Sequence, residues 1–139
     1  KQDEPNFIDS SRLVELVVDD HVVKDGSPPT AGIKNVEFVR LSPELGPVEG
    51  HRYWREHHGP IAARIPGLQR YVQSHVRPGA YGRPTAPPFD GVAITWWDDM
   101  AAMRASAVSA ELAATRADEA NFLGAVPDVI LTTEHVILG

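Results

Sequence analysis

Residues 48–76, VEGHRYWREHHGPIAARIPGLQRYVQSHV, contain the helix and the strand that decide the fold of this chain. The first part has helical spacing, because one stripe of residues recurs at steps of three or four. That stripe consists of Val48, His51, Trp54 and His58. We expect the helix to end near His57 or His58, since the ring of Pro60 would clash with the carbonyl group four residues earlier. A second short helical turn, residues 60–64, then begins with proline at its first position.

A strand follows the break at Pro66-Gly67. Its residues, Leu68–Val76, alternate between two faces, because successive side chains of a strand point to opposite sides. Tyr71, Gln73 and His75 share one face. This polar face is where the sequence predicts a site.

Three more strands and one helix flank this unit. The strands are predicted at Ile33–Leu41, Gly91–Trp97 and Val129–Leu138. The Ala-rich helix is predicted at Met100–Arg116, with Asp98 or Asp99 as its N-cap. The order strand, helix, strand, strand, helix, strand predicts an α+β, ferredoxin-like βαββαβ fold, with two helices on one face of a four-stranded antiparallel sheet.

The other face of such a sheet is left bare. Apolar groups on it, such as Trp96 or Trp97, cannot remain in water, so a second sheet is expected to cover them. Two sheets packed face to face make a dimeric α+β barrel, with space for a ligand between the sheets. The proline-rich Arg77–Asp90 segment is predicted to be an irregular loop, either a lid that closes this pocket or a disordered segment.

The composition excludes several classes of function. The chain has 139 residues, 42% of them hydrophobic, which is enough for one compact core. A formal charge of −6, with 13 Lys and Arg, argues against nucleic acid and anionic membranes as partners. Cysteine is absent, and the Lys1–Asp9 start lacks the order of a signal peptide, so we expect a soluble, cytoplasmic protein whose chemistry depends on His, Tyr, Asp, Glu or Arg.

The two ends of the chain resemble each other. Residues 3–7, DEPNF, reappear as residues 118–122, DEANF, and the apolar segments that follow them contain His21 and His135. One interpretation is a repeat, in which residues 1–30 are an extension with an edge or swapped strand at Leu13–Val23, the tail of a preceding repeat, and residues 31–139 are the domain. The alternative is chance similarity between two apolar strands.

Residues 53–60 (YWREHHGP) and 65–71 (IPGLQRY) resemble the signature of the EthD-like family of dimeric α+β barrel proteins. The resemblance covers roughly residues 33–138. It implies a ferredoxin-like fold, a homodimer or a pairing with a homologous repeat, and no metal or organic cofactor. Members include lactone isomerases of aromatic catabolism, small decarboxylases or dehydratases of polyketide pathways, and accessory proteins of ether degradation, so the family indicates architecture better than reaction.

In the isomerase branch of that family, the functional pair matches His58 and Tyr71 of this chain. The long loop at 77–90 departs from the isomerase pattern and leaves the substrate open. A histidine at a helix C-terminus is favoured as imidazolium and suits a general acid or base. The alternative is a structural role, in which the imidazole caps the helix by bonding its last carbonyl groups, and this role fits His57 better than His58.

The remaining candidates have alternatives too. Tyr71 can stabilise an oxyanion while His75 moves a proton, but Tyr71 also suits a core position and His75 lies where the strand leaves the sheet. Ligand contacts are predicted for Trp54, His57, Glu37, Trp97 and Gln73. His21 and His135 follow carboxylates, but neighbours on a strand point to opposite faces, so a structural role is favoured over a metal site.

The leading hypothesis is a cofactor-independent lyase or isomerase that acts on a small cyclic or aromatic-derived oxygenated compound. His58 would carry the proton, Tyr71 would donate to an oxyanion and His75 would assist. A non-catalytic accessory protein that shelters a small ligand is the second hypothesis, and it predicts an apolar cavity without a convergent His and Tyr pair. A haem or oxygen-dependent barrel enzyme is the third.

Overall fold

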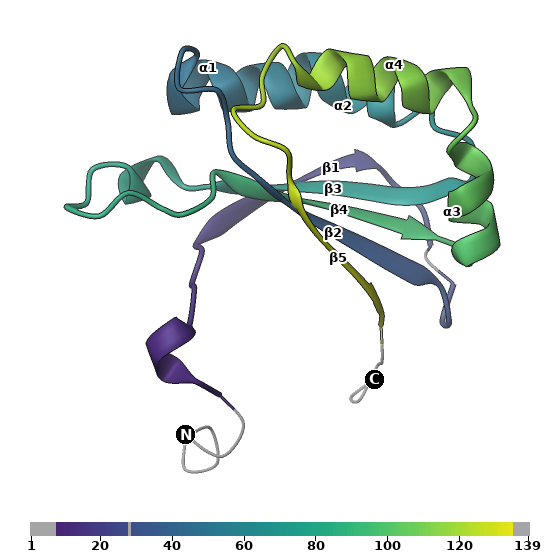
Figure 1. Cartoon of the computed structure of the whole chain (residues 1–139), viewed down its shortest axis with the longest axis horizontal. Helices are drawn as coiled ribbons and strands as arrows, with labels where there is room; N and C mark the ends of the chain where they lie inside the picture. Colours follow the sequence, from purple (N-terminus) through teal and green to yellow (C-terminus); the bar gives the residue numbers. More distant parts are fainter. Residues whose placement is uncertain (1–7, 28, 135–139) are drawn as a thin grey trace.

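The computed structural model describes residues 8–27 and 29–134. One five-stranded antiparallel sheet has the strand order β1-β3-β4-β2-β5, and the labelled α-helices lie on one side of it (Figure 1). The strands are β1 (Val18–Lys24), β2 (Ile33–Val39), β3 (Leu68–Val76), β4 (Gly91–Trp97) and β5 (Asp128–Thr133). Without β1, the remaining elements have the βαββαβ order of the predicted α+β, ferredoxin-like fold, which is confirmed.

The first helical segment is continuous, and the predicted stop at His57 or His58 is wrong. It consists of α1 (Gly46–Tyr53), a π-helical turn (Trp54–His58) and α2 (Gly59–Ala62). The Gly59 N–H bonds to the carbonyl of Trp54, five residues earlier. One residue is thereby added to the turn, and the ring of Pro60 is accommodated without breaking the helix. His58 therefore does not lie at a helix C-terminus. Val48, predicted on one stripe with Trp54 and His58, is 73% exposed, whereas those two are buried.

The second helical segment is divided, although one helix was predicted. It consists of α3 (Met100–Ser106) and α4 (Ala110–Glu119). Asp99 caps α3 as expected, because its carboxylate accepts a hydrogen bond from the Ala102 N–H at 2.7 Å. Ser109 is the N-cap of α4, since its hydroxyl accepts from the Leu112 N–H at 3.1 Å, and the same hydroxyl donates to the carbonyl of Ser106, the last residue of α3, at 2.7 Å. The new helix start directs α4 across the sheet, above the site.

The core lies between the helices and the sheet. Its largest side chains are Trp54, Tyr71, Trp97 and Phe122, with Leu41 and Leu68 beside them. Trp54 is only 1% exposed. Among the described residues, no α-helix covers the opposite face of the sheet (Figure 1). An apolar groove on that face is lined by Phe38, Val92, Ile94 and Ile130, and by Val14 and Leu16 from the N-terminal segment.

The N-terminal strand is shorter than predicted and begins at Val18. It pairs with β3, so β1 and β5 form opposite edges of the sheet. The first copy of the repeated pattern, residues 3–7, and His135 of the second copy lie outside the described residues. Within the described ranges, no helix is long and apolar enough to cross a membrane.

Candidate active site

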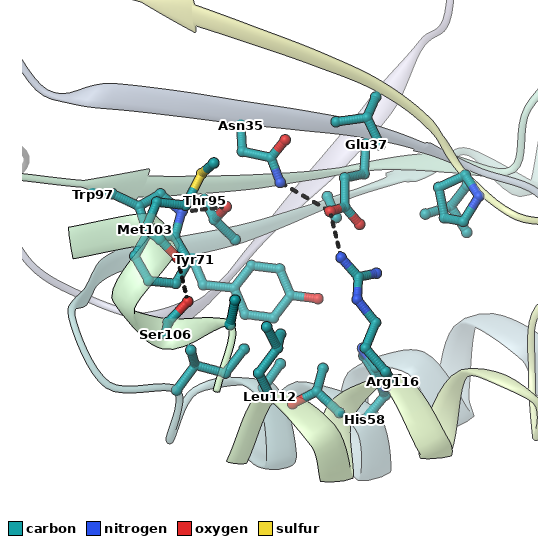
Figure 2. Close-up of a pocket in the computed structure, with 18 of the residues that line it drawn as sticks. Asn35, Glu37, His58, Tyr71, Thr95, Trp97, Met103, Ser106, Leu112 and Arg116 are labelled. Carbon is teal, nitrogen blue, oxygen red and sulfur yellow. Dashed lines mark hydrogen bonds and ion pairs between the residues drawn. The ribbon is translucent and has the colours of Figure 1, made fainter. Parts of the chain in front are cut away.

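A cavity of about 350 Å³ lies between the helix layer and the sheet (Figure 2). Most of its wall is apolar, formed by Trp54, Trp97, Met103, Leu112, Phe122 and Leu131. Its polar groups come from His58, Tyr71, Glu37, Asn35, Thr95 and Arg116. This cavity is therefore not the predicted one between two sheets, and no residue from 77 to 90 lines it. The predicted pocket between two sheets, closed by this loop, stays a prediction, and Phe89 of the loop lines the groove on the open face.

His58 is held by a carboxylate. Its Nδ1 lies 2.9 Å from Oδ2 of Asp118, which belongs to the last turn of α4. Tyr53 donates its hydroxyl to Oδ1 of Asp118 at 2.7 Å, and Asn121 donates its amide to the same oxygen at 3.0 Å. A carboxylate only accepts, so Nδ1 of His58 carries the proton and Nε2 keeps its lone pair. No group in the described part of the chain bonds to that Nε2.

Burial and this carboxylate act on His58 in opposite directions. Burial lowers the pKa of His58 below its ordinary value and outweighs the effect of Asp118, which raises it. Burial alone would raise the pKa of Asp118, but hydrogen bonds from Tyr53, Asn121 and His58 hold that pKa below its usual range. The ring of Phe122 packs on the imidazole with 4.6 Å between centroids. At neutral pH the result is a neutral, oriented imidazole beside an ionised carboxylate.

Tyr71 is the second polar group of the cavity wall. Its hydroxyl oxygen accepts hydrogen bonds from Nε1 of Trp54 at 3.1 Å and from Nε2 of Gln73 at 3.0 Å. Burial raises the pKa of Tyr71 well above that of a free tyrosine, so the group stays protonated. Among the described residues, none accepts the hydroxyl proton. Tyr71 can therefore donate to a ligand in the cavity.

An ionic bridge spans the cavity from β2 to α4 (Figure 2). Glu37 accepts a hydrogen bond from Asn35 at 2.9 Å, and Nη2 of Arg116 lies 3.6 Å from the same oxygen. Arg116 also donates to Glu119 at 2.6 Å. Glu37 lines the cavity as predicted for a ligand contact, but it is already paired, which suits it to shaping the site more than to acting as a second base.

Three predicted site residues do not line the cavity. His57 is exposed and lies against the ring of Tyr53, with 4.9 Å between centroids. Gln73 is buried beneath the π turn, and its amide lies between the side chains of Tyr71 and His75. Tyr71 and His75 therefore do not face each other across a ligand, and His75 does not line the cavity. Trp54, His58, Tyr71, Trp97 and Glu37 do line the cavity.

His75 belongs to a separate cluster of aromatic rings. It stacks on Trp54 and on His51, with 4.6 Å between centroids in each case, and His21 meets its edge at 4.6 Å. Burial, then the like charges of His51 and His21, lower the pKa of His75 to about 3. His75 is neutral at physiological pH. It does not line the cavity, so it has no position there from which to assist the proton transfer as predicted. In the described ranges, no cluster of three or more His, Cys, Asp or Glu could hold a metal ion.

The sequence prediction missed the groups on α4 and just after it. Asp118, Asn121 and Phe122 all support His58, and Arg116 approaches Glu37. Three of these belong to the repeated pattern DEANF, so the repeat itself was the available signal. It was interpreted only as a sign of duplication, because a single sequence does not show that residue 118 reaches residue 58.

Comparison with known proteins places these features in a family. The EthD domain profile matches residues 42–125, which include His58, Tyr71 and Asp118. No curated protein sequence is similar enough to this chain to count as a match.

Two solved structures share the fold. One is an ethyl tert-butyl ether D (EthD) family protein from Bacillus halodurans C-125, with a TM-score of 0.60 and 17% identity, over 75% of this chain and 99% of that one. The other is a "putative monooxygenase" from Lactobacillus acidophilus NCFM, with a TM-score of 0.54 and 10% identity, over 86% of this chain. This chain covers 54% of the length of that second protein. The profile match over most of the chain and the shared fold show that this chain belongs to the EthD domain family.

Proposed function

We propose that this chain is a cofactor-independent lyase or isomerase that moves a proton at a carbon atom next to a carbonyl or lactone group. One observation supports this most strongly: a lone pair on Nε2 of His58 and a proton on the hydroxyl of Tyr71, neither engaged within the described protein, both belong to the wall of one apolar cavity. An unused acceptor and an unused donor are what proton abstraction from a carbon acid requires.

The chemistry follows from these two groups. Nε2 of His58 removes the proton from carbon, the electron pair of that C–H bond forms the C=C bond of the enolate, and the π pair of the carbonyl group moves to its oxygen. The hydroxyl of Tyr71 donates a hydrogen bond to the developing enolate. Asp118 stabilises the imidazolium that forms, as the carboxylate of a catalytic triad does. The imidazolium then returns the proton to another carbon in an isomerisation, or to a leaving oxygen in a dehydration.

The wall of the cavity indicates the kind of substrate. Trp54, Trp97 and Phe122 offer flat apolar surfaces, and Met103 and Leu112 complete them. Such a wall favours a small cyclic or aromatic-derived compound with few polar groups. A low-polarity cavity also strengthens the hydrogen bond from Tyr71, because water does not compete for it.

The alternative of a non-catalytic binding protein is less well supported. That hypothesis predicts an apolar cavity without a histidine and a tyrosine that face the same ligand. Here both line the cavity, and Asp118 orients the histidine. Burying a hydrogen-bonded His–Asp pair costs desolvation energy, which simple shelter for an apolar ligand does not require.

A second candidate is oxygen-dependent chemistry. The Lactobacillus protein bears the name "putative monooxygenase", and in this chain the same base could deprotonate a phenol whose anion then reacts with O₂. Oxygen uptake during turnover separates the two candidates, because an isomerase or a dehydratase consumes none.

The direct test is exchange of carbon-bound hydrogen in D₂O, with 2-tetralone as the probe and proton NMR as the readout. Wild-type protein should speed deuterium uptake at the carbon next to the carbonyl, and His58→Ala should reduce the protein-catalysed rate by about a hundredfold or more. His57→Ala is the matched control, since its side chain is exposed and outside the cavity. Equal rates for wild type and folded His58→Ala would remove His58 from the mechanism.

A further inference from the structure

Gln73 is a fully buried amide that the proposed chemistry does not use. It lies on β3, its relative exposure is 0%, and it does not line the cavity. Its three hydrogen bonds join the π turn, the cavity and the histidine cluster. Nε2 donates to the carbonyl of Trp54 at 2.9 Å and to the hydroxyl of Tyr71 at 3.0 Å, and Oε1 lies 3.1 Å from Nε2 of His75. An amide buried with every partner in place points to a specific task.

The orientation of this amide is determined by its partners. The carbonyl of Trp54 can only accept, so the nitrogen end of Gln73 must face it. The oxygen end then faces His75, whose Nε2 must carry a proton in order to donate. His75 is itself held in place, because Trp54 and His51 stack on its ring and His21 meets its edge. Neither the amide nor the imidazole can turn over without breaking a buried hydrogen bond.

This orientation decides where the proton of Tyr71 can point. A phenol has one O–H donor and an oxygen that accepts. With N–H groups of Trp54 and Gln73 both directed at that oxygen, the proton has to leave in the remaining direction. Tyr71 lines the cavity, and the described protein offers no acceptor for its proton.

We infer that Gln73, oriented by the carbonyl of Trp54 and by His75, is a positioning residue that directs the hydroxyl proton of Tyr71 into the cavity. This inference rests on the proposed function, in which Tyr71 donates to a carbonyl oxygen of the ligand. His75 thereby has a role in the site without touching the ligand. The π turn also has a role in the site, since the carbonyl of Trp54 accepts hydrogen bonds from both the Gly59 N–H and the Gln73 amide.

The substitution Gln73→Glu tests the direction of the proton at nearly constant shape. A glutamate in this dry position is expected to be protonated, because burial disfavours its charged form. Its protonated oxygen takes the place of Nε2 and donates its O–H to the carbonyl of Trp54, so a lone pair of that same oxygen faces the hydroxyl of Tyr71 where the second amide N–H used to be, and the other oxygen still faces His75. Tyr71 then donates its hydroxyl proton to the side chain of residue 73, and that proton no longer points into the cavity.

The readout is the carbonyl ¹³C resonance of labelled acetophenone added to the protein. A hydrogen bond to the carbonyl moves this resonance downfield, so wild type should show a downfield bound signal that Tyr71→Phe abolishes. Gln73→Glu should match Tyr71→Phe. Gln69→Glu, the same change at a half-buried position of β3 whose amide bonds to Asp98, should match wild type.

Any other pattern of acetophenone signals refutes either the positioning role of Gln73 or the donor role of Tyr71. A wild-type signal in Gln73→Glu refutes the positioning role and leaves Tyr71 as donor. A wild-type signal in Tyr71→Phe refutes the donor role in the proposed function, and the positioning role falls with it. An unshifted acetophenone signal with wild-type protein refutes both. If Gln73→Glu does not fold, ¹⁵N NMR of wild-type His75 decides: a neutral ring with its proton on Nε2 is required, and a proton on Nδ1 contradicts the inference.

Discussion

At the scale of single residues, the site consists of one neutral imidazole and one protonated phenol. Burial lowers the pKa of His58 and raises that of Tyr71, so each group stays uncharged at neutral pH. Both are then in the state that enolisation needs, a base with a lone pair and a donor with a proton. The carboxylate of Asp118 determines which nitrogen of His58 is the base.

We predict that Asp118→Asn inactivates the site without changing its shape. The oxygen of the new amide is expected to remain where Tyr53 and Asn121 donate, which turns its NH₂ group toward Nδ1 of His58. The proton of His58 must then move to Nε2, and the base is lost. Deuterium uptake into 2-tetralone should fall by about a hundredfold or more. ¹⁵N NMR should show the exchanged tautomer.

The control for this change is Asp19→Asn, which alters an exposed ion pair with Arg77 and should leave the exchange rate unchanged. Wild-type exchange by Asp118→Asn, or an unchanged tautomer of His58, would show that the carboxylate does not orient the base.

The lowered histidine pKa values predict a loss of stability in mild acid. His51, His58 and His75 all have pKa values below the ordinary 6.5 in the folded chain. As the pH falls from about 6.5, the unfolded chain takes up these protons first, so the free energy of unfolding decreases. Each group contributes a slope of up to about 1.4 kcal/mol per pH unit, until the pH reaches its folded pKa.

Urea denaturation at pH 7.5 and pH 5 measures this effect. The midpoint should be clearly lower at pH 5, and His75→Phe should make the pH dependence shallower even if it lowers stability overall. A midpoint that is equal or higher at pH 5 would contradict the burial of neutral histidines described above.

At the scale of elements, the period of the strands could be predicted from sequence and the course of the helices could not. The alternation in residues 68–76 correctly places Tyr71, Gln73 and His75 on one face, because the period of a strand is fixed at two. The helix end predicted from Pro60 was wrong, because the π turn removes the clash between the proline ring and the carbonyl group four residues earlier. Asp118 could not be predicted as the partner of His58, because that contact depends on how α4 lies across the sheet.

Gly91 tests how closely the helical segment packs on β4. A Cβ atom at this position would lie 2.5 Å from the carbonyl oxygen of Ser74 and 2.7 Å from Cζ3 of Trp54. Gly91→Ala should therefore displace the indole and destabilise the chain by about 1–3 kcal/mol. Urea denaturation and tryptophan fluorescence measure the two effects.

Gly79→Ala is the matched control, because a Cβ there would meet no atom within 4 Å. It should change the denaturation midpoint little. Equal stability of the two variants would show that Trp54 is not packed against the start of β4.

At the scale of the whole molecule, the sheet has one covered and one open face. The helices enclose the cavity, whereas the groove on the other face exposes side chains of β2, β4 and β5. We propose that a companion sheet covers this face, either from a second copy of the chain or from a homologous repeat. The companion sheet would cover the open face, whereas the cavity beside His58 is formed by side chains of this chain.

Ile130→Lys tests that assembly. Ile130 lies on the open face and is 52% exposed in the single chain, so a lysine should cost an isolated chain little. In an assembly it would place a charge between two sheets. Native mass spectrometry should show a dimer for wild type and a monomer for Ile130→Lys.

Val126→Lys is the matched control, because Val126 is 87% exposed and lies outside the strands. It should keep the wild-type mass. A monomeric wild type, or a dimeric Ile130→Lys variant, would refute the proposed contact between two copies through this face.

The repeated pattern at the two ends stays a prediction at this scale. In the copy at residues 118–122, Asp118, Asn121 and Phe122 each contact His58 or support a group that does. The same residue types at 3, 6 and 7 would be expected in the tail of a preceding repeat that had its own site. We propose that β1, paired with β3, is the last strand of such a repeat.

The central claim is that a small carbonyl compound binds between the helices and the sheet of a single chain. Intermolecular NOEs between 2-tetralone and the methyl groups of the protein test it most directly. We predict NOEs to Met103 and Leu112, which line the cavity, and none to Ile94 or Ile130 on the open face. NOEs to Ile94 and Ile130 without any to Met103 and Leu112 would place the ligand on the wrong side of the sheet and contradict the account.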